Sequence, residues 1–357
     1  MLKSHFNLKK DETEEAESEE EPVTEAIVEE EKMVIDISEE RILKKSEVSI
    51  RLSWLGKTAE GDGYTYLKAT ITWMKLTNIE AITCFKHLQF VDVSNNNLNI
   101  QRLQPVTELP FLILLQADNN ELYTAALKTC KYLQVLILNY NQLTTVKHVF
   151  QPQLSTLEVG YNQINEIVVN KMPHLRCIDF RYNVIRELPL AMDFPKLDSL
   201  YLAGNKIKSL LGIETLTNLR ILHVRNNPIK YLNGFVPELV KLQYLNLRNC
   251  KVATLRQVKK LRMLPALEVL ILKGTPYLGG PGKESAEAAV EEEDPEIRVE
   301  VLAALPKLKR FNKTEYSPEE RQEAKELMNQ WQEEGEKDEE DDEDVAEELG
   351  EEMRPNE

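Results

Sequence analysis

Leu133-Gln-Val-Leu-Ile-Leu-Asn-Tyr-Asn-Gln-Leu143 is the stretch that decides the fold of this chain. It has apolar residues at positions one, four, six and eleven and an asparagine at position nine. The central L-x-L alternates with a period of two, which predicts a short strand with one buried side. The asparagine follows the strand, where its amide can bond backbone groups that a turn would otherwise bury unpaired.

The frame L-x-x-L-x-L-x-x-N-x-L occurs nine times between residues 88 and 278. Successive frames begin 24, 21, 21, 21, 22, 22, 23 and 25 residues apart, starting from Leu88. In the first eight frames the asparagine position holds Asn96, Asn120, Asn141, Asn162, Asn183, Asn205, Asn227 and Cys250. Thr275 fills this position in the ninth frame, where the regularity ends. Nine frames in register indicate an internal repeat, in which each unit stacks on the next.

One repeat cannot fold alone. About five buried aliphatic side chains contribute roughly 7–15 kcal/mol. Ordering ~22 residues costs roughly 30 kcal/mol. Neighbouring coils must therefore share a core. The pattern predicts an α/β solenoid of short, 21–22-residue leucine-rich repeats, with a parallel strand ladder on its concave face. The short period leaves room for only 3₁₀ turns or short helices on the convex side.

The residues before the array predict a cap. We interpret residues 41–87 as an N-terminal cap and a degenerate first repeat, and residues 88–278 as the leucine-rich repeats. The core of the degenerate repeat should contain Ile71, Leu76, Ile79 and Ile82. Val48, Ile50 and Leu52 alternate with polar residues, which predicts an edge strand there.

The residues after the array predict a second cap. Residues 279–296 are expected to form an acidic loop insertion, and residues 297–316 a final half-repeat that closes the core. Residues 317–335 are expected to form an amphipathic helix, because Ser-Pro-Glu-Glu is a helix start. Its apolar stripe consists of Ala324, Leu327, Met328 and Trp331. The stripe either docks on the convex side or binds a partner.

Charge is divided by region. Residues 1–40 contain 15 acids and 4 bases, and residues 281–357 contain 28 acids and 10 bases, which leaves the middle with 17 acids and 30 bases. The segments 1–40 and 336–357 are expected to be acidic disordered tails. A flexible tail of 40 residues has a reach of roughly 35 Å. Such a tail is long enough to screen part of the basic middle.

Motifs for catalysis are absent from the sequence. It contains no P-loop, GxSxG or HExxH, and its four cysteines have no metal-ligand spacing. We therefore expect a non-enzymatic protein without cofactor, metal or small-molecule substrate. There is no apolar run of ~18 residues, so we expect no membrane span. The scattered cysteines and the lack of a secretory signal favour the cytosol.

The frame also predicts which side chains face outward on the concave side. Candidate partner-binding residues are Asp92, Asp118, Tyr140, Glu158, Tyr161, Asp179, Arg181, Tyr182, Tyr201, His223, Arg225, Arg248 and Lys273. Carboxylates gather in the first five repeats and cations in the last five, which predicts a surface of two signs. Three tyrosines that precede the ladder asparagine in consecutive repeats should form a column. Tyr and Arg are typical of interfaces, although solvated strand faces also carry them.

Several strings point to one family. The sequences of residues 91–95, 241–248 and 306–311, the weak opening repeat at 76–82 and the Glu-rich helix after residue 316 resemble the leucine-rich-repeat family of the axonemal radial spoke. The resemblance covers about residues 45–335. It implies a structural adaptor that binds other spoke proteins in the cytoplasm and axoneme of motile cilia and sperm flagella, where it supports motility. It implies no catalytic residue.

Other functions compete with this interpretation, because a repeat fold alone does not select one. A phosphatase-regulating repeat protein would use concave aromatic and acidic contacts to a globular enzyme. An acidic nuclear repeat protein that binds histones would share the order of repeats followed by an acidic tail, but the basic middle argues against it. A nucleic-acid binder is disfavoured, because two acidic tails would repel phosphates.

Overall fold

The computed structural model describes residues 40–58, 61–283 and 294–333. The chain divides into two units, residues 1–40 and residues 41–357, and the elements described belong to the second unit. The predicted tails, 1–40 and 336–357, and most of the predicted loop at 279–296 lie outside the described residues.

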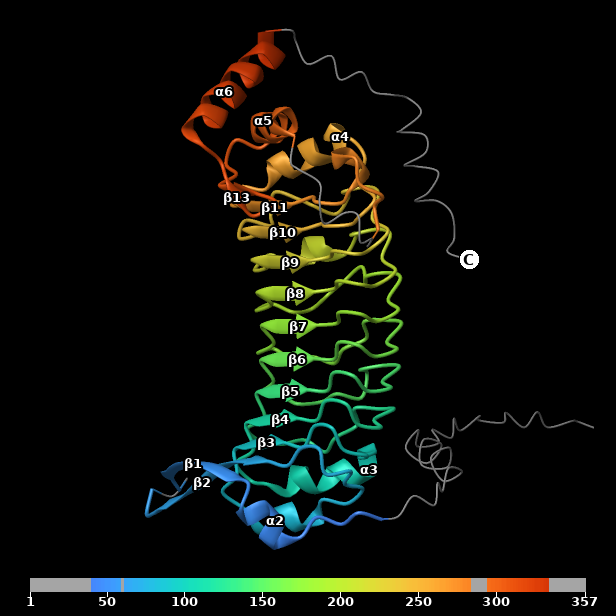
Figure 1. The fold of residues 1–357 in the computed structure, drawn as a ribbon, viewed down its shortest axis with the longest axis vertical. Coiled ribbons are helices and arrows are strands. Elements are labelled where there is room, and N and C mark those ends of the chain that lie inside the picture. Colours follow the sequence, from blue (N-terminus) through green and yellow to red (C-terminus); the bar gives the residue numbers. More distant parts are fainter. Residues whose placement is uncertain (1–39, 59–60, 284–293, 334–357) are drawn as a thin grey trace, which may run out of the picture. The chain divides into compact units, whose positions relative to one another are not determined.

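A single sheet dominates the described residues, with thirteen strands in chain order and parallel pairing from the second strand to the twelfth (Figure 1). The strands are β1 (Leu52–Lys57), β2 (Tyr64–Thr70), β3 (Phe90–Asp92), β4 (Leu114–Gln116), β5 (Val135–Ile137), β6 (Thr156–Glu158), β7 (Cys177–Asp179), β8 (Ser199–Tyr201), β9 (Ile221–His223), β10 (Tyr244–Asn246), β11 (Val269–Ile271), β12 (Arg310–Phe311) and β13 (Thr314–Glu315). Strands β3 to β11 are the nine predicted frames, so the predicted solenoid is confirmed.

The register keeps equivalent positions side by side. Leu157 of β6 pairs with Leu136 of β5 and with Ile178 of β7, and all three side chains are buried. The frame's aliphatic residues from all coils form one continuous hydrophobic core. Pairing is antiparallel only at the two ends, between β1 and β2 and between β12 and β13. We call the solvent-facing side of this sheet the ladder face; it is the surface predicted as concave.

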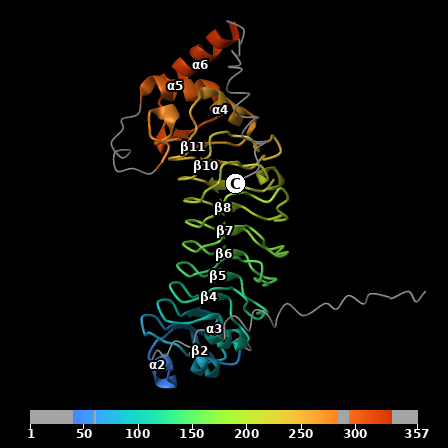
Figure 2. The same ribbon diagram turned by 90° about the vertical axis from the view of Figure 1, so that its right-hand side faces the viewer.

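The side opposite the strands contains only short helical segments in the repeats, because 21 to 25 residues per coil leave little length for more. The helical elements are α2 (Lys45–Ser49), η2 (Glu80–Cys84), α3 (Ile100–Leu103), η3 (Gln104–Glu108), η4 (Ile213–Thr215), α4 (Leu255–Lys259), η5 (Lys260–Met263), η6 (Pro276–Leu278), α5 (Pro295–Ala304) and α6 (Pro318–Glu333). Figure 2 shows coils without helices between β5 and β8.

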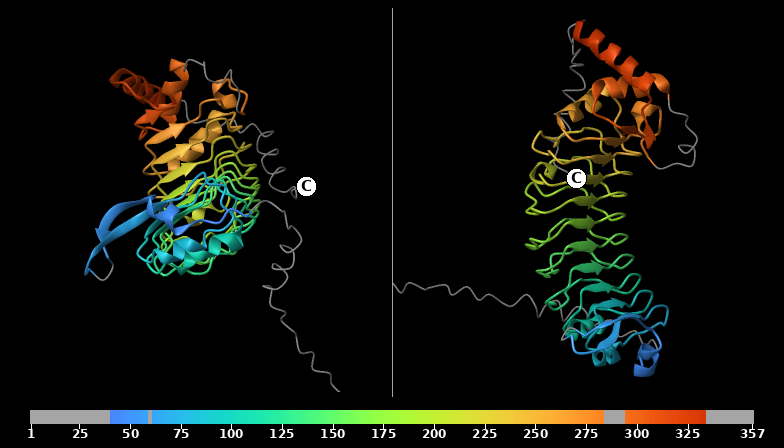
Figure 3. Two further views of the ribbon diagram at one scale, coloured as in Figure 1. Left: turned by 60° about the horizontal axis from the view of Figure 1, so that its bottom comes forward. Right: turned by 90° about the vertical axis from the view of Figure 1, so that its left-hand side faces the viewer.

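The N-terminal cap differs from the expected edge strand. Val48 and Ile50 belong to α2 and its C-terminal end, with Val48 buried and Ile50 exposed, and the strand begins only at Leu52. Glu47 accounts for the difference: its carboxylate accepts the Lys44 N–H at 2.9 Å and so caps the first turn of a helix. Strands β1 and β2 then form a hairpin that pairs with β3 and projects beside the stack (Figure 3).

The C-terminal cap is more helical than the expected half-repeat. Residues 295–304 form α5, which starts inside the predicted loop because Asp294 accepts the Glu296 N–H at 2.9 Å. Strand β12 then extends the ladder from β11, and β13 turns back on it. Val301, Leu302 and Leu305 belong to the continuous hydrophobic core.

Helix α6 packs on α5 and covers the end of the array. Ala324 is buried, and Leu327, Met328 and Trp331 contact the core. Lys259 of α4 lies with its Nζ 4.8 Å from the centre of the Trp331 ring. Of the two alternatives for this stripe, docking is the one observed, although the stripe docks on the end cap and not along the convex side.

Candidate functional site

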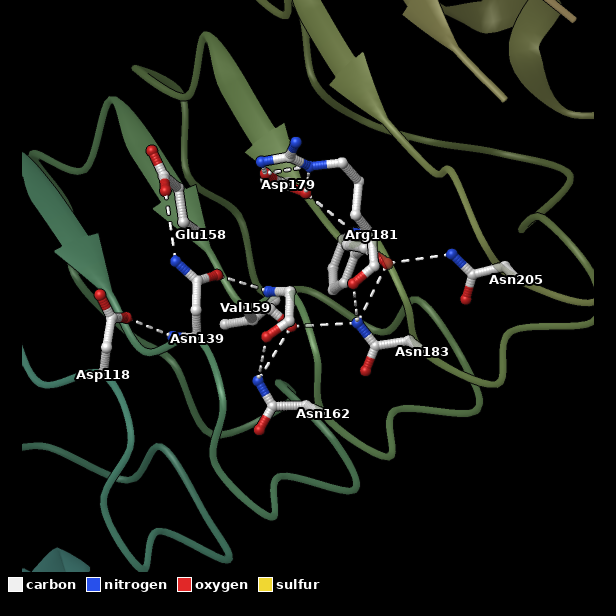
Figure 4. Close-up of polar contacts among 11 residues, drawn as sticks. Asp118, Asn139, Glu158, Val159, Asn162, Asp179, Arg181, Asn183 and Asn205 are labelled. Atoms are coloured by element: carbon white, nitrogen blue, oxygen red, sulfur yellow. Dashed lines mark hydrogen bonds and ion pairs between the residues drawn. The ribbon is translucent and has the colours of Figure 1, made fainter. Parts of the chain in front are cut away.

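The buried asparagines that follow the strands, here called the amide ladder, fix the turn after each strand. Asn162 donates through Nδ2 to the carbonyls of Leu138, Val159 and Gly160 at 3.0–3.1 Å. Its Oδ1 accepts the Leu143 N–H at 3.0 Å. One buried side chain therefore joins its own turn to the preceding coil. Figure 4 shows the same arrangement repeated at Asn183 and Asn205.

In the last two repeats, the ladder position holds Cys250 and Thr275 in place of asparagine. Cys250, which is fully buried, makes one bond from Sγ to the Val224 carbonyl at 3.3 Å. Beyond Thr275, Asn312 accepts the N–H groups of Leu272 and Lys273 at 2.8 and 3.0 Å. Sequence reasoning missed Asn312, because the C-terminal cap lacks the full frame. Its place one residue after the apolar Phe311 was the available signal.

The residue before each ladder position has a left-handed backbone. Asn95, Asn119, Tyr140, Tyr161, Tyr182, Gly204, Asn226, Asn249 and Gly274 all have φ between 50° and 77°. The three tyrosine rings stack, with centroids 4.2 and 4.5 Å apart, so the predicted column exists. Gly204 takes the same position in the next repeat, and its backbone lies directly against the Tyr182 ring. A Cβ on residue 204 would lie 2.6 Å from that ring, so only glycine fits there. The column therefore lines the edge of the ladder face at the turns.

The N-terminal half of the ladder face is acidic and internally bonded. Asp118 accepts the backbone N–H of Asn139 at 2.7 Å, and Asn139 accepts the Gly160 N–H at 2.7 Å (Figure 4). The Asn139 amide also approaches Glu158, at 3.4 Å. Partial burial raises the pKa of both Asp118 and Glu158, and neighbouring carboxylates, Asp179 among them, add to this effect. An approaching cation would relieve this repulsion.

The acidic and basic halves of the ladder face meet at the fifth repeat. Arg181 donates from Nε to Asp179 at 2.7 and 2.9 Å, and its Nη2 lies 2.5 Å from the same carboxylate. Asp179 is only 4% exposed. It was predicted as a contact residue, but Arg181 covers it, so its role is to hold that guanidinium. Asp92, Asp118 and Glu158 remain half-exposed.

The C-terminal half of the ladder face is basic. Arg225, Arg248 and Lys273 take the same outward position after β9, β10 and β11, and each is partly exposed. Among the described residues, none of the three has a carboxylate partner. Beside them the rings of Tyr201, His223 and Tyr244 stack with centroids 4.9 and 4.8 Å apart. Tyr244 was not predicted, because it occupies the outward position just before the central leucine of the frame.

The position just before the central aliphatic residue of each frame forms a third outward column on the ladder face. It contains Phe90, Leu114, Val135, Ile221 and Val269, all partly exposed. At its N-terminal end the Trp54 ring meets Phe90 edge-on at 5.0 Å, and Lys68 lies over Trp54. The hairpin around it exposes Leu55, Tyr64, Tyr66 and, just beyond β2, Trp73. Several large apolar side chains are therefore exposed together on this hairpin.

His223 should resist protonation near neutral pH. Burial, followed by the charges of Arg181 and Arg225, lowers its pKa to about 4, although Asp179 acts in the opposite direction. An unfolded histidine takes up its proton near pH ~6.5. The unfolded chain therefore binds more protons between these values, and stability falls as the pH is lowered from about 6.5 to about 4.

Two measurements test this prediction. The imidazole of His223, followed by nitrogen-detected NMR, should titrate with a midpoint near 4. The melting temperature of His223→Phe should depend less on pH across that interval than the wild-type value. A midpoint near ~6.5 would contradict the account.

Metal sites and membrane-spanning helices are not found among the described residues. No group of three or more His, Cys, Asp or Glu side chains among them is placed to hold a metal ion. None of the helices in the described ranges is long and apolar enough to cross a bilayer. The ladder face and the hairpin beside it present an acidic area, a basic area, an apolar column and a group of exposed aromatic rings.

Such a ladder defines a short-period leucine-rich-repeat protein, and comparison with known proteins agrees. Residues 195–237 match the family model described as Leucine Rich repeats (2 copies). Leucine-rich repeat-containing protein 23 of Bos taurus is 34% identical over 77% of this chain and 77% of its own length. The Homo sapiens protein is 34% identical over 79% and 78%. This chain belongs to the leucine-rich repeat-containing protein 23 family.

Among solved structures, an internalin from Listeria monocytogenes aligns over 71% of this chain and 84% of its own, with 18% identity and a TM-score of 0.44. A likeness at this level says nothing about the partners of either protein.

Proposed function

We propose that this protein is a non-catalytic adaptor of the radial spoke in motile cilia and sperm flagella, and that it binds other spoke proteins through its ladder face. The observation that carries the binding role is the partly exposed ladder face itself, which has crowded carboxylates at one end and, at the other, cations that pair with no carboxylate of the described residues. The spoke assignment rests on the family resemblance described above.

The ladder face suits an adaptor for a physical reason. Each outward side chain stands on a strand whose position is fixed by the amide ladder and by the shared core. Contacts can therefore form without ordering a loop, which avoids part of the entropic cost of association. Acidic, basic and aromatic areas on one surface allow partners of different chemistry to bind at different repeats.

Localisation tests the proposal. A fluorescently tagged full-length chain expressed in multiciliated cells should give signal along the axoneme that survives detergent extraction of the membrane and soluble matrix. Signal confined to the nucleus or diffuse in the cytoplasm would contradict the spoke assignment. Recovery of a phosphatase catalytic subunit as the main partner would favour the phosphatase-regulating alternative.

A further inference from the structure

Within the described part of the chain, no carboxylate pairs with the basic end of the ladder face. Arg225, Arg248 and Lys273, here called the cation file, follow three neighbouring strands, which lie ~4.8 Å apart. Like charges at this spacing repel one another. The Nε of Arg248 has no hydrogen-bond partner although it is buried. By contrast, Arg181 is neutralised by Asp179. The cation file is therefore a surface that an anionic segment would stabilise.

The surroundings of the cation file favour a peptide. The stacked rings of Tyr201, His223 and Tyr244 lie beside it, and Arg225 is close enough to lower the pKa of His223, after the larger effect of burial. Guanidinium groups form charge-assisted hydrogen bonds to carboxylates, so an acidic peptide suits this surface.

The chain itself contains an acidic segment that follows α6 in the sequence. Residues 334–357 contain 14 acids and 2 bases, and every residue from Asp338 to Asp344 is acidic. Trp331, two residues before the end of α6, lies against Lys259 of α4. Helix α4 belongs to the coil that joins β10 to β11, the strands followed by Arg248 and Lys273. The C-terminal end of α6 therefore lies against the coil that bears Arg248 and Lys273.

Length and tethering both permit contact. Residues 338–344 lie 5 to 11 residues beyond Glu333, the last residue of α6, and a flexible tether of that length has a reach of roughly 12–18 Å. The cation file spans two strand spacings, roughly 10 Å. A tethered segment acts at an effective concentration on the order of millimolar, so it competes well with acidic segments free in solution.

We propose that residues 338–344 dock on the cation file and occupy the basic end of the ladder face until an acidic partner displaces them. This docking occupies the same ladder face to which we assign partner binding above, so it rests on that proposed function. The experiment below needs no partner, so either proposal can fail while the other stands.

Carbodiimide cross-linking of the full-length chain, read by mass spectrometry, tests the contact. Lys273 should form amide links to carboxylates of residues 338–344 at about 50 mM salt, and lose them at about 500 mM salt. Lys251, an exposed lysine in the turn after Cys250, is the matched control and should form few such links. In a chain with Arg225→Gln and Arg248→Gln, the Lys273 links should fall by about fivefold.

Three outcomes would overturn the proposal. Equal yields at Lys273 and Lys251 would show non-specific attraction. A yield unchanged by the two glutamine substitutions would show that the cation file is not the docking surface. Links that join ¹⁵N-labelled to unlabelled chains in a mixed sample would show that a second copy is the occupant.

Discussion

Asn162→Leu should destabilise the protein by about 2–4 kcal/mol. The substitution removes the partner of the buried Leu143 N–H and deprives three carbonyls of one bond each. Each of the three carbonyls keeps a second donor: Asn141 bonds the Leu138 carbonyl, Asn183 the Val159 carbonyl and the Tyr140 N–H the Gly160 carbonyl. The unpaired N–H and the apolar side chain in a polar niche therefore account for most of the loss.

Urea unfolding monitored by circular dichroism measures this effect. Asn162→Cys should lose less than Asn162→Leu, because the thiol can make the single bond that Cys250 makes in its own repeat. Gln163→Ala, at the exposed neighbouring position, should change stability by less than about 0.5 kcal/mol. If Asn162→Leu matched Gln163→Ala, the amide would not be what holds the coils in register.

Arg298→Met should destabilise the C-terminal cap by about 2–3 kcal/mol. Arg298 is 6% exposed, and its Nε donates to Glu320 at 2.6 Å, which joins α5 to α6. Its guanidinium also lies 4.8 Å from the centre of the Tyr316 ring. Methionine keeps the length of the side chain but leaves the partly buried Glu320 carboxylate without its cationic partner, with the Ser317 N–H still bonded to it.

The effect of Arg298→Met should depend on pH. Burial raises the pKa of Glu320, but the hydrogen bonds from Arg298 and from the Ser317 N–H outweigh burial, and the pKa lies below its ordinary value. The pair therefore stabilises the fold fully above pH ~4.3, and its contribution is lost as the pH falls through the lower folded value.

Thermal unfolding at pH 7 and pH 3 should show a large difference between wild type and Arg298→Met at the first pH and a small one at the second. Arg310→Met, which breaks the exposed pair with Glu315, is the matched control and should cost less than about 1 kcal/mol. Equal losses for the two variants would mean that α6 is not held by the buried pair.

The repeat pattern made most of the fold predictable. Aliphatic residues and an amide at fixed spacing define both the strand and the turn, so β3 to β11 follow from the frame. The caps were harder, because no repeat constrains them. The apolar alternation in residues 48–52 and 297–305 fits a strand or a short helix, and capping by Glu47 and Asp294 selects the helix.

The candidate site was predicted in part. The frame places outward side chains correctly, and it anticipated the tyrosine column and the change of sign along the face. It could not foresee that Arg181 folds back on Asp179, because side-chain pairing within one strand end depends on local rotamers. The aromatic hairpin was missed for a similar reason, since Trp54 and Phe90 meet only after β1 has turned back beside β2.

The central claim is that the ladder face, and not the rest of the surface, joins this protein to its assembly. Two full-length chains with matched charge changes test it: Asp92→Lys with Glu158→Lys on the ladder face, and Glu121→Lys with Glu166→Lys at exposed positions in the turns beyond it. The measurement is the fraction of each chain retained on detergent-extracted axonemes of ciliated cells, for variants whose melting temperatures match the wild type. The account predicts that the first variant is retained about tenfold less than wild type and the second about equally. Equal retention of both variants, or loss of the second alone, would contradict it.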